Sequence, residues 1–113
     1  MIKIYHNPRC AKSREGLAVL EKSGKDFEIV LYLKDTPSKK ELESILKKLG
    51  YSAMELIRKN EAVWKEHFKG KELSEEALIE AMVTYPKLIE RPIVITEKKA
   101  VVGRPADKIK ELL

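Results

Sequence analysis

Apolar and polar positions alternate at the start of the chain, where Lys3 separates Ile2 from Ile4. This period of two predicts a strand. Three later segments are short and rich in Ile, Val and Leu, and they also predict strands: residues 27–33, 93–95 and 100–102. The last two are joined by residues 96–99, a turn of hairpin length. The pattern therefore predicts two strands near the beginning of the chain and two near its end.

Other segments repeat their apolar residues with the spacing of an α-helix. The clearest predicted helix begins at Ser38, which forms a capping box with Glu41, and ends at Gly50. Its apolar residues fall at i, i+3, i+4 and i+7 and are Leu42, Ile45, Leu46 and Leu49. We expect further helices over residues 10–23, about 74–85 and 105–113, and shorter helical stretches between residues 54 and 73.

The order of these elements predicts an α/β fold. A strand, a helix and a second strand within the first 33 residues favour a βαβ unit with parallel strands. A helical insertion over about residues 38–86 follows, and the chain then ends with two strands and a helix. We expect one domain over residues 1–113, built on a four-stranded mixed sheet.

The cysteine content restricts the function classes. The single cysteine, Cys10, excludes an intramolecular disulfide and a four-cysteine zinc module. The two histidines, His6 and His67, lie too far apart in the sequence to indicate a metal site. No apolar segment approaches the ~20 residues of a membrane span. The apolar stretch at the start of the chain, residues 1–5, is too short for a signal peptide. We therefore expect a cytoplasmic protein that binds no metal and contacts no membrane.

The net charge of +5 comes from 23 Lys and Arg residues against 18 Asp and Glu residues. Most of the cations are lysines that are mixed with glutamates along predicted helices, which is typical of a solvent-exposed face. Few aromatic residues accompany them, so we expect no nucleic-acid partner. The five arginines lie at special places: two flank the cysteine, two precede prolines, and Arg58 follows an apolar helical stretch. This placement favours planar, bidentate anion binding.

Residues 6–14 connect the first predicted strand to the first predicted helix with the sequence His-Asn-Pro-Arg-Cys-Ala-Lys-Ser-Arg. Cys10 falls at the helix N-terminus, where unpaired N–H groups and the helix dipole stabilise a thiolate and bind anions. Three cationic side chains lie within four residues of it: Arg9, Lys12 and Arg14. We interpret Cys10 as a reactive thiol rather than a buried structural cysteine, while His6 is either a neighbour that tunes the thiol or a loop histidine.

Four motifs follow one another along the chain: H-N-P-R-C-A-K-S-R at 6–14, L-I-R-K-N at 56–60, E-R-P-I-V at 90–94 and G-R-P-A at 103–106. The first resembles the H-N-P-x-C-x-x-S-R signature of the ArsC family of glutaredoxin-coupled arsenate reductases. The other three resemble the remaining landmarks of that family, in the same order. The resemblance covers residues 2–113 and implies a thioredoxin-like fold with a helical insertion between strands 2 and 3.

The resemblance also implies roles for individual residues. Cys10 is the implied catalytic nucleophile, and Pro92 is expected to follow a cis peptide bond. The arginines that would hold the substrate oxyanion are Arg58, Arg91 and Arg104. His6 and Ser13 match positions that the resemblance implies to tune the cysteine. Lys12 and Arg14 are expected to tune it as well, through their charge beside the thiol.

The implied reaction is the reduction of arsenate to arsenite through an adduct on the Cys10 thiolate. Glutathione is the implied co-substrate and glutaredoxin the implied partner of a monomer that carries no bound cofactor. Since no second cysteine exists to resolve the adduct, the reductant must come from outside. Ala11-Lys12 stands where the plasmid-borne resistance enzymes have Gly-Thr, and the tail is shorter. In both respects the chain resembles the short chromosomal branch of the family.

Two alternatives use the same cysteine differently. Residues 10–13 are also a monothiol C-x-x-S motif, as in a glutaredoxin-like thiol oxidoreductase, and a reductase of another oxyanion would keep the same machinery. The predicted arginine ligands argue against a glutathione disulfide as substrate, because a disulfide needs no such cage. A non-enzymatic regulator similar to Spx, which binds RNA polymerase, typically has C-x-x-C, whereas Ser13 fills the second position here.

Overall fold

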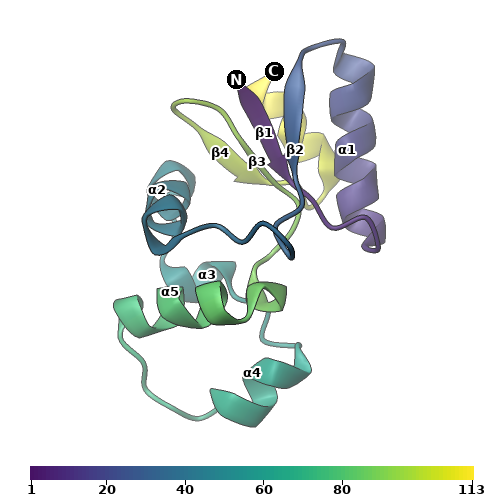
Figure 1. The fold of residues 1–113 in the computed structure, drawn as a ribbon. Helices are drawn as coiled ribbons and strands as arrows, with labels where there is room; N and C mark the ends of the chain where they lie inside the picture. Colours follow the sequence, from purple (N-terminus) through teal and green to yellow (C-terminus); the bar gives the residue numbers. More distant parts are fainter. The chain divides into compact units, whose positions relative to one another are not determined.

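A computed structural model describes the chain from Met1 to Leu113. It divides into two compact units, one formed by residues 1–35 with 91–113 and the other by residues 36–90 (Figure 1). The second unit consists of helices and corresponds to the insertion expected at about 38–86. None of the helices combines the length and the apolar character that crossing a membrane requires.

The first unit is built on one four-stranded sheet. Its strands are β1 (Ile2–Tyr5), β2 (Phe27–Val30), β3 (Ile93–Ile95) and β4 (Ala100–Val102). They lie in the order β2-β1-β3-β4, with β1 parallel to β2 and the other neighbouring pairs antiparallel. Ile4 in β1 is paired with Ile29 on one side and Val94 on the other. This mixed sheet confirms the predicted α/β class and has the thioredoxin-like arrangement.

One face of this sheet packs against α1 (Ala11–Ser23) and the 3-10 helix η2 (Ala106–Leu112), which also contact each other (Figure 1). The centre of the contact is fully buried and consists of Ile4, Leu20, Val94 and Ile109. Side chains removed from water in this way supply most of the favourable free energy of folding. The packing fixes the start of α1, and with it Cys10, at the carboxyl end of β1.

Two glycines allow a close approach around the ring of Pro92. A Cβ atom placed on Gly16 in α1 would lie 2.7 Å from Pro92 Cγ, and one placed on Gly103 after β4 would lie 3.0 Å from it. The same two positions also meet Ile109 Cδ1, at 3.0 Å and 2.8 Å. Because neither glycine has a side chain, α1 and the segments that flank β3 and β4 can pack directly against Pro92 and Ile109.

The second unit contains five short helices. They are α2 (Lys39–Leu49), α3 (Ala53–Leu56), α4 (Ala62–His67), α5 (Glu75–Thr84) and the 3-10 helix η1 (Pro86–Leu88). Within this unit α5 packs against α2, α3 and η1. The capping box predicted for α2 is confirmed, since Ser38 Oγ accepts from Glu41 N–H and Glu41 Oε1 accepts from Ser38 N–H. Ser74 caps α5 through a hydrogen bond from Ala77 N–H.

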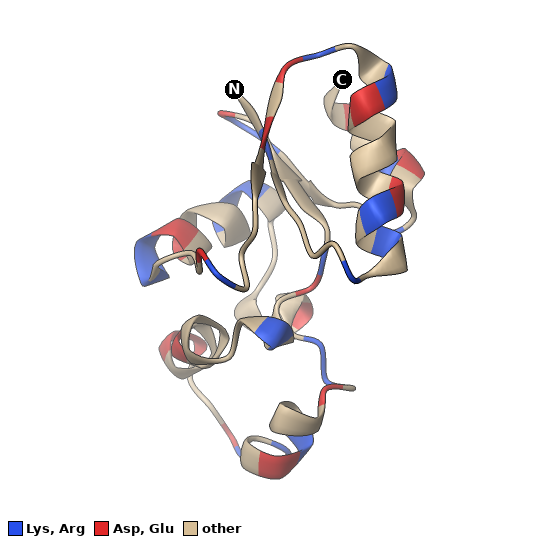
Figure 2. Ribbon diagram, turned by 45° about the vertical axis from the view of Figure 1, so that its right-hand side comes forward, with Lys and Arg blue, Asp and Glu red and all other residues tan.

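Charged residues of both signs are mixed along the helices of both units (Figure 2). Such mixing is what the lysine-glutamate pattern of the sequence indicated. The excess of positive charge is therefore not concentrated in one helix.

Two predicted elements differ from the structure. The strand expected over 27–33 ends at Val30, because the next residues turn: Lys34 and Asp35 N–H both donate to Leu31 O, at 2.9 and 2.8 Å. The last helix is a 3-10 helix, and Pro105 precedes it rather than occupying its first position. An apolar run by itself does not reveal where a strand stops pairing with its neighbour.

Candidate active site

The loop between β1 and α1 is held by several hydrogen bonds between residues close together in sequence. Cys10 N–H donates to Asn7 O at 3.0 Å, and Arg9 N–H donates to Asn7 Oδ1 at 3.1 Å. From the first turn of α1, Arg14 Nη1 donates to Pro8 O at 2.9 Å. The loop that carries the thiol is therefore tied both to itself and to the helix that follows.

Cys10 is the N-cap residue of α1. Its backbone is extended, with φ −94° and ψ 121°, and its carbonyl accepts the hydrogen bond of Arg14 N–H at 3.0 Å. Its side chain is half-buried. The backbone N–H of Ser13, in the first turn of the helix, lies near the sulfur and favours the thiolate, which lowers the pKa of Cys10. A group at this position receives the positive end of the helix dipole as well.

Ser13 and His6 form a buried polar pair next to this turn. Ser13 Oγ lies 2.6 Å from His6 Nδ1 and also accepts from Asn7 N–H at 3.0 Å. Both side chains are almost fully buried, so these hydrogen bonds satisfy groups that water cannot reach. Burial of the imidazole and the nearby charge of Arg14 lower the pKa of His6 below its ordinary value of 6.5. The pair is therefore neutral at pH 7 and holds the loop against α1.

Two arginines from the ends of β3 and β4 lie beside the thiol of Cys10. Arg91 precedes β3 and Arg104 follows β4, and because these strands are antiparallel neighbours, the two residues come together. Arg104 Nη2 lies 3.8 Å from Cys10 Sγ, and its Nε donates to Arg91 O at 2.8 Å. The peptide bonds that join Arg91 to Pro92 and Arg104 to Pro105 are both cis. Two guanidinium groups are thus placed beside one sulfur atom.

These groups change the acidity of Cys10. Partial burial, the largest single influence, raises the pKa of the thiol, but it is outweighed by hydrogen bonds from Ser13 N–H, Arg91 and Arg104 and by the charge of Arg91. Together they lower the pKa of Cys10 from 9.0 to about 7. At neutral pH about half of the thiol is then ionised, compared with about one per cent at the ordinary pKa.

We expect the alkylation rate of Cys10 to report this pKa directly. Because only the thiolate reacts, the rate with iodoacetamide should rise with pH and reach half of its maximum near pH 7. The urea-unfolded chain is the control, since it has the same single cysteine without Arg91 and Arg104 beside it, and its midpoint should lie near 9.0. Equal midpoints for the folded and unfolded chains would contradict this account of the site.

A reactive thiol at a helix N-terminus with two arginines beside it invites comparison with known proteins. Residues 5–112 match the ArsC family. This chain belongs to the ArsC family. The match covers all four motifs, including the loop of Cys10 and both Arg-Pro pairs.

The ArsC relatives match this chain over its whole length. The uncharacterized protein YfgD of Escherichia coli (strain K12) is 50% identical over 114 residues, which covers 99% of this chain and 96% of that protein. The arsenate reductase of Neisseria meningitidis (strain Z2491) is 44% identical and covers 99% and 97%. The solved structure of an arsenate reductase from Vibrio cholerae has a TM-score of 0.94 and 43% identity, and the alignment covers 99% of this chain and 97% of that one.

The structure brings together Cys10, Ser13, Arg91 and Arg104 from the predicted ArsC site. His6 is joined to this group through Ser13, and Arg14 acts on the loop through Pro8. Lys12 is exposed and lies 3.7 Å from the carboxylate of Glu15, where it forms an ion pair along the helix. The cations next to Cys10 in sequence thus contribute less to its acidity than two arginines that lie about 80 and 94 residues away.

Arg58 belongs to the second unit. It follows α3, where its N–H donates to Leu88 O at 2.7 Å and the neighbouring Ile57 pairs with Ile89. Its guanidinium Nε lies 3.9 Å from Glu61 Oε2, and its Nη1 is buried without a hydrogen-bond partner. Its role as a ligand of the substrate stays a prediction.

Sequence reasoning missed three residues that shape the site. Asn7 forms the turn before Cys10, and the Asn-Pro pair that follows the first strand was the available signal. Gly16 and Gly103 are required by the contacts with Pro92, and a glycine inside a predicted helix is a signal of close packing.

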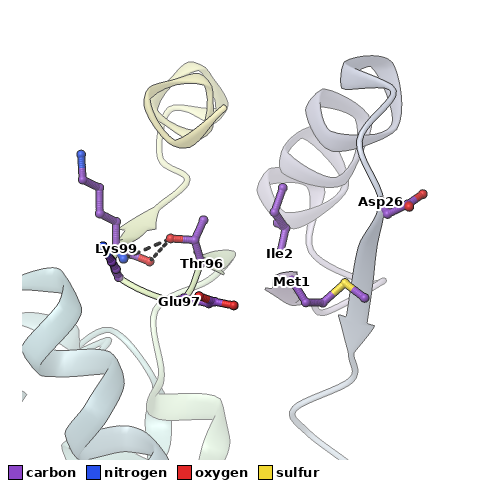
Figure 3. A pocket seen from close by; sticks show the side chains of 7 residues that line it. Met1, Ile2, Asp26, Thr96, Glu97 and Lys99 are labelled. Atoms are coloured by element: carbon purple, nitrogen blue, oxygen red, sulfur yellow. Dashed lines mark hydrogen bonds between the residues drawn. The ribbon is translucent and has the colours of Figure 1, made fainter.

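A cavity of about 700 Å³ lies away from Cys10 and the two arginines beside it (Figure 3). It is lined by Met1 and Ile2 at the start of β1, by Asp26, and by the turn from Thr96 to Lys99. These residues lie at the opposite end of β1 from Cys10, and the cavity contains no thiol. We assign it no part in the chemistry.

Proposed function

We propose that this protein reduces arsenate to arsenite, with Cys10 as the nucleophile and glutathione and glutaredoxin as the external reductants. The observation that carries the proposal is the 3.8 Å approach of Arg104 Nη2 to Cys10 Sγ, with Arg91 beside it. A thiolate and a binding place for the oxygens of a tetrahedral oxyanion coincide there. Relatives that bear the name arsenate reductase support the choice of arsenic.

The first step forms a bond between sulfur and arsenic. The Cys10 thiolate attacks arsenic(V), one oxygen accepts a proton and leaves as water, and a thiol ester of arsenate remains on the enzyme. Arg91 and Arg104 neutralise the charge on the other oxygens, a contribution that commonly dominates oxyanion chemistry. Arg58 is proposed as a third ligand, and its unpartnered buried Nη1 suits that role.

The next steps transfer two electrons. An external thiol replaces a second oxygen, which leaves as water, so that arsenic(V) carries two sulfur atoms. A second thiol attacks the sulfur of the first, a disulfide forms, and arsenic keeps the electron pair of the broken bond. Water then hydrolyses the bond between Cys10 and arsenic(III). One arsenate and two thiols thus give one arsenite, one disulfide and one water.

The requirement for an external thiol follows from the composition, since Cys10 is the only cysteine. Glutathione is abundant in the reducing cytoplasm, and we place the protein there on that ground. All residues of the proposed site belong to one chain, so a monomer is sufficient. No bound cofactor is needed, because the electrons come from the thiols.

Release of arsenite tests this proposal. We expect the protein to produce arsenite from arsenate over many turnovers when glutathione and glutaredoxin are both present, and to produce none without glutathione. The matched control is the same mixture without the protein. A rate equal to that control would sink the proposal, and turnover of a glutathionylated peptide instead would favour the monothiol oxidoreductase.

A further inference from the structure

A cavity of about 290 Å³ lies next to the loop that carries the reactive thiol. One wall consists of residues 6–9, which end directly before Cys10. The other wall consists of Leu31, Leu33 and Lys34, from the segment that follows β2. The volume is close to the lower limit for a small-molecule site, about 300 Å³.

Both walls are fixed by hydrogen bonds before any ligand arrives. The loop wall is held by Arg14 Nη1 on Pro8 O and by Asn7 N–H on Ser13 Oγ. The other wall is a turn in which two successive N–H groups donate to Leu31 O. A preformed site of this kind loses little conformational entropy on binding.

The apolar part of the cavity consists of two of the few large hydrophobic side chains that are exposed in this protein. Leu31 is 38% exposed and Leu33 is 37% exposed, and only Met1 and Ile29 are comparable among the large hydrophobic residues. Ile29 lies in β2, at the edge of the sheet, just before the same segment. Exposed apolar side chains that line a cavity beside a reactive group indicate a contact with the body of a ligand.

The charged part of the cavity is positive. Arg9 and Lys34 are its charged lining residues, and no carboxylate faces them within the cavity. Both side chains are exposed and neither takes part in an ion pair. A ligand with carboxylates would therefore find two uncompensated cations, one on each wall.

We propose that this cavity binds the external reductant, a small peptide thiol with carboxylates at its ends. Arg9 and Lys34 pair with the carboxylates, Leu31 and Leu33 contact the aliphatic body, and the thiol is directed toward the adduct on Cys10. This assignment rests on the proposed function, which requires such a thiol. It adds where the thiol binds and why an anionic thiol is preferred over a neutral one.

Charge reversal in the cavity tests the assignment. In the double variant Arg9→Glu, Lys34→Glu, we expect the KM for glutathione to rise about tenfold or more, because two charge-assisted contacts become repulsive. The ratio of the rate with glutathione to the rate with 2-mercaptoethanol, which has no carboxylate, should fall by a similar factor. The control Lys25→Glu, Lys98→Glu makes the same change in net charge outside this cavity and should leave both quantities unchanged.

A binding measurement separates this assignment from the proposed function. Titration of the isotope-labelled protein with S-methylglutathione, which cannot react, should shift the amide resonances of residues 6–9 and 31–34, and the double variant should weaken those shifts. This holds even if arsenate is not the substrate. Shifts elsewhere, or equal shifts in the variant and the control, would overturn the assignment. An effect on the KM for glutaredoxin alone would overturn it too, in favour of a protein surface.

Discussion

Replacement of Cys10 by serine is expected to reduce arsenite release to the rate measured without protein. The serine hydroxyl does not ionise near pH 7, so no adduct with arsenic forms and neither external thiol has a substrate. The assay is arsenite release with arsenate, glutathione and glutaredoxin. Turnover by Cys10→Ser at more than a small fraction of the original rate would remove Cys10 from the mechanism.

The same variant should not lose stability. Cys10 is the N-cap residue of α1, and serine is among the preferred residues at that position because its oxygen accepts from an N–H of the first turn. Urea unfolding should therefore give an equal or higher free energy of unfolding, by up to about 1 kcal/mol. Loss of activity together with retained stability would show that the thiol serves chemistry rather than packing.

Replacement of Arg104 by alanine is expected to lower kcat/KM for arsenate by about 10² to 10³, the usual effect of removing one donor from an oxyanion site. It removes both the contact with Cys10 Sγ at 3.8 Å and the hydrogen bond that orders Arg91 through its carbonyl. The alkylation midpoint of Cys10 should also move upward from about 7, because one group that lowers the pKa of the thiol is gone.

Two further variants define this effect. Arg104→Lys keeps the charge but not the fork of N–H donors, so an intermediate loss is expected. Lys108→Ala removes an exposed cation on η2 and should leave both kcat/KM and the midpoint unchanged. If Arg104→Ala altered kcat/KM no more than Lys108→Ala does, Arg104 would not be a ligand of the substrate.

Much of the fold could be predicted because it depends on local patterns. The helix from Lys39 to Leu49 has a capping box, a regular apolar face and a terminal glycine, and all three are features of neighbouring residues. The end of β2 at Val30 was less predictable, because residues 31–33 are as apolar as a strand. Whether a strand continues depends on a partner, and that partner lies elsewhere in the sequence.

The candidate site also has a part that local sequence predicts and a part that it does not. The place of Cys10 at a helix N-terminus follows from the strand, the loop and the helix that surround it in sequence. The cations that lower its pKa do not follow from its neighbours, since Lys12 pairs with Glu15 while Arg91 and Arg104 approach the sulfur. Only the antiparallel pairing of β3 and β4 brings those two arginines together.

The sequence by itself predicted one reactive thiol, a dependence on a second thiol from outside, and an α/β scaffold with a helical insertion. These conclusions need only residue counts, periodicity and motifs. The tertiary structure decided which charges act on Cys10 and where a cavity opens beside it. Charge interactions and cavities depend on distances between segments that are far apart in the chain. Gly16 and Gly103 allow such segments to pack closely around Pro92, because neither has a side chain.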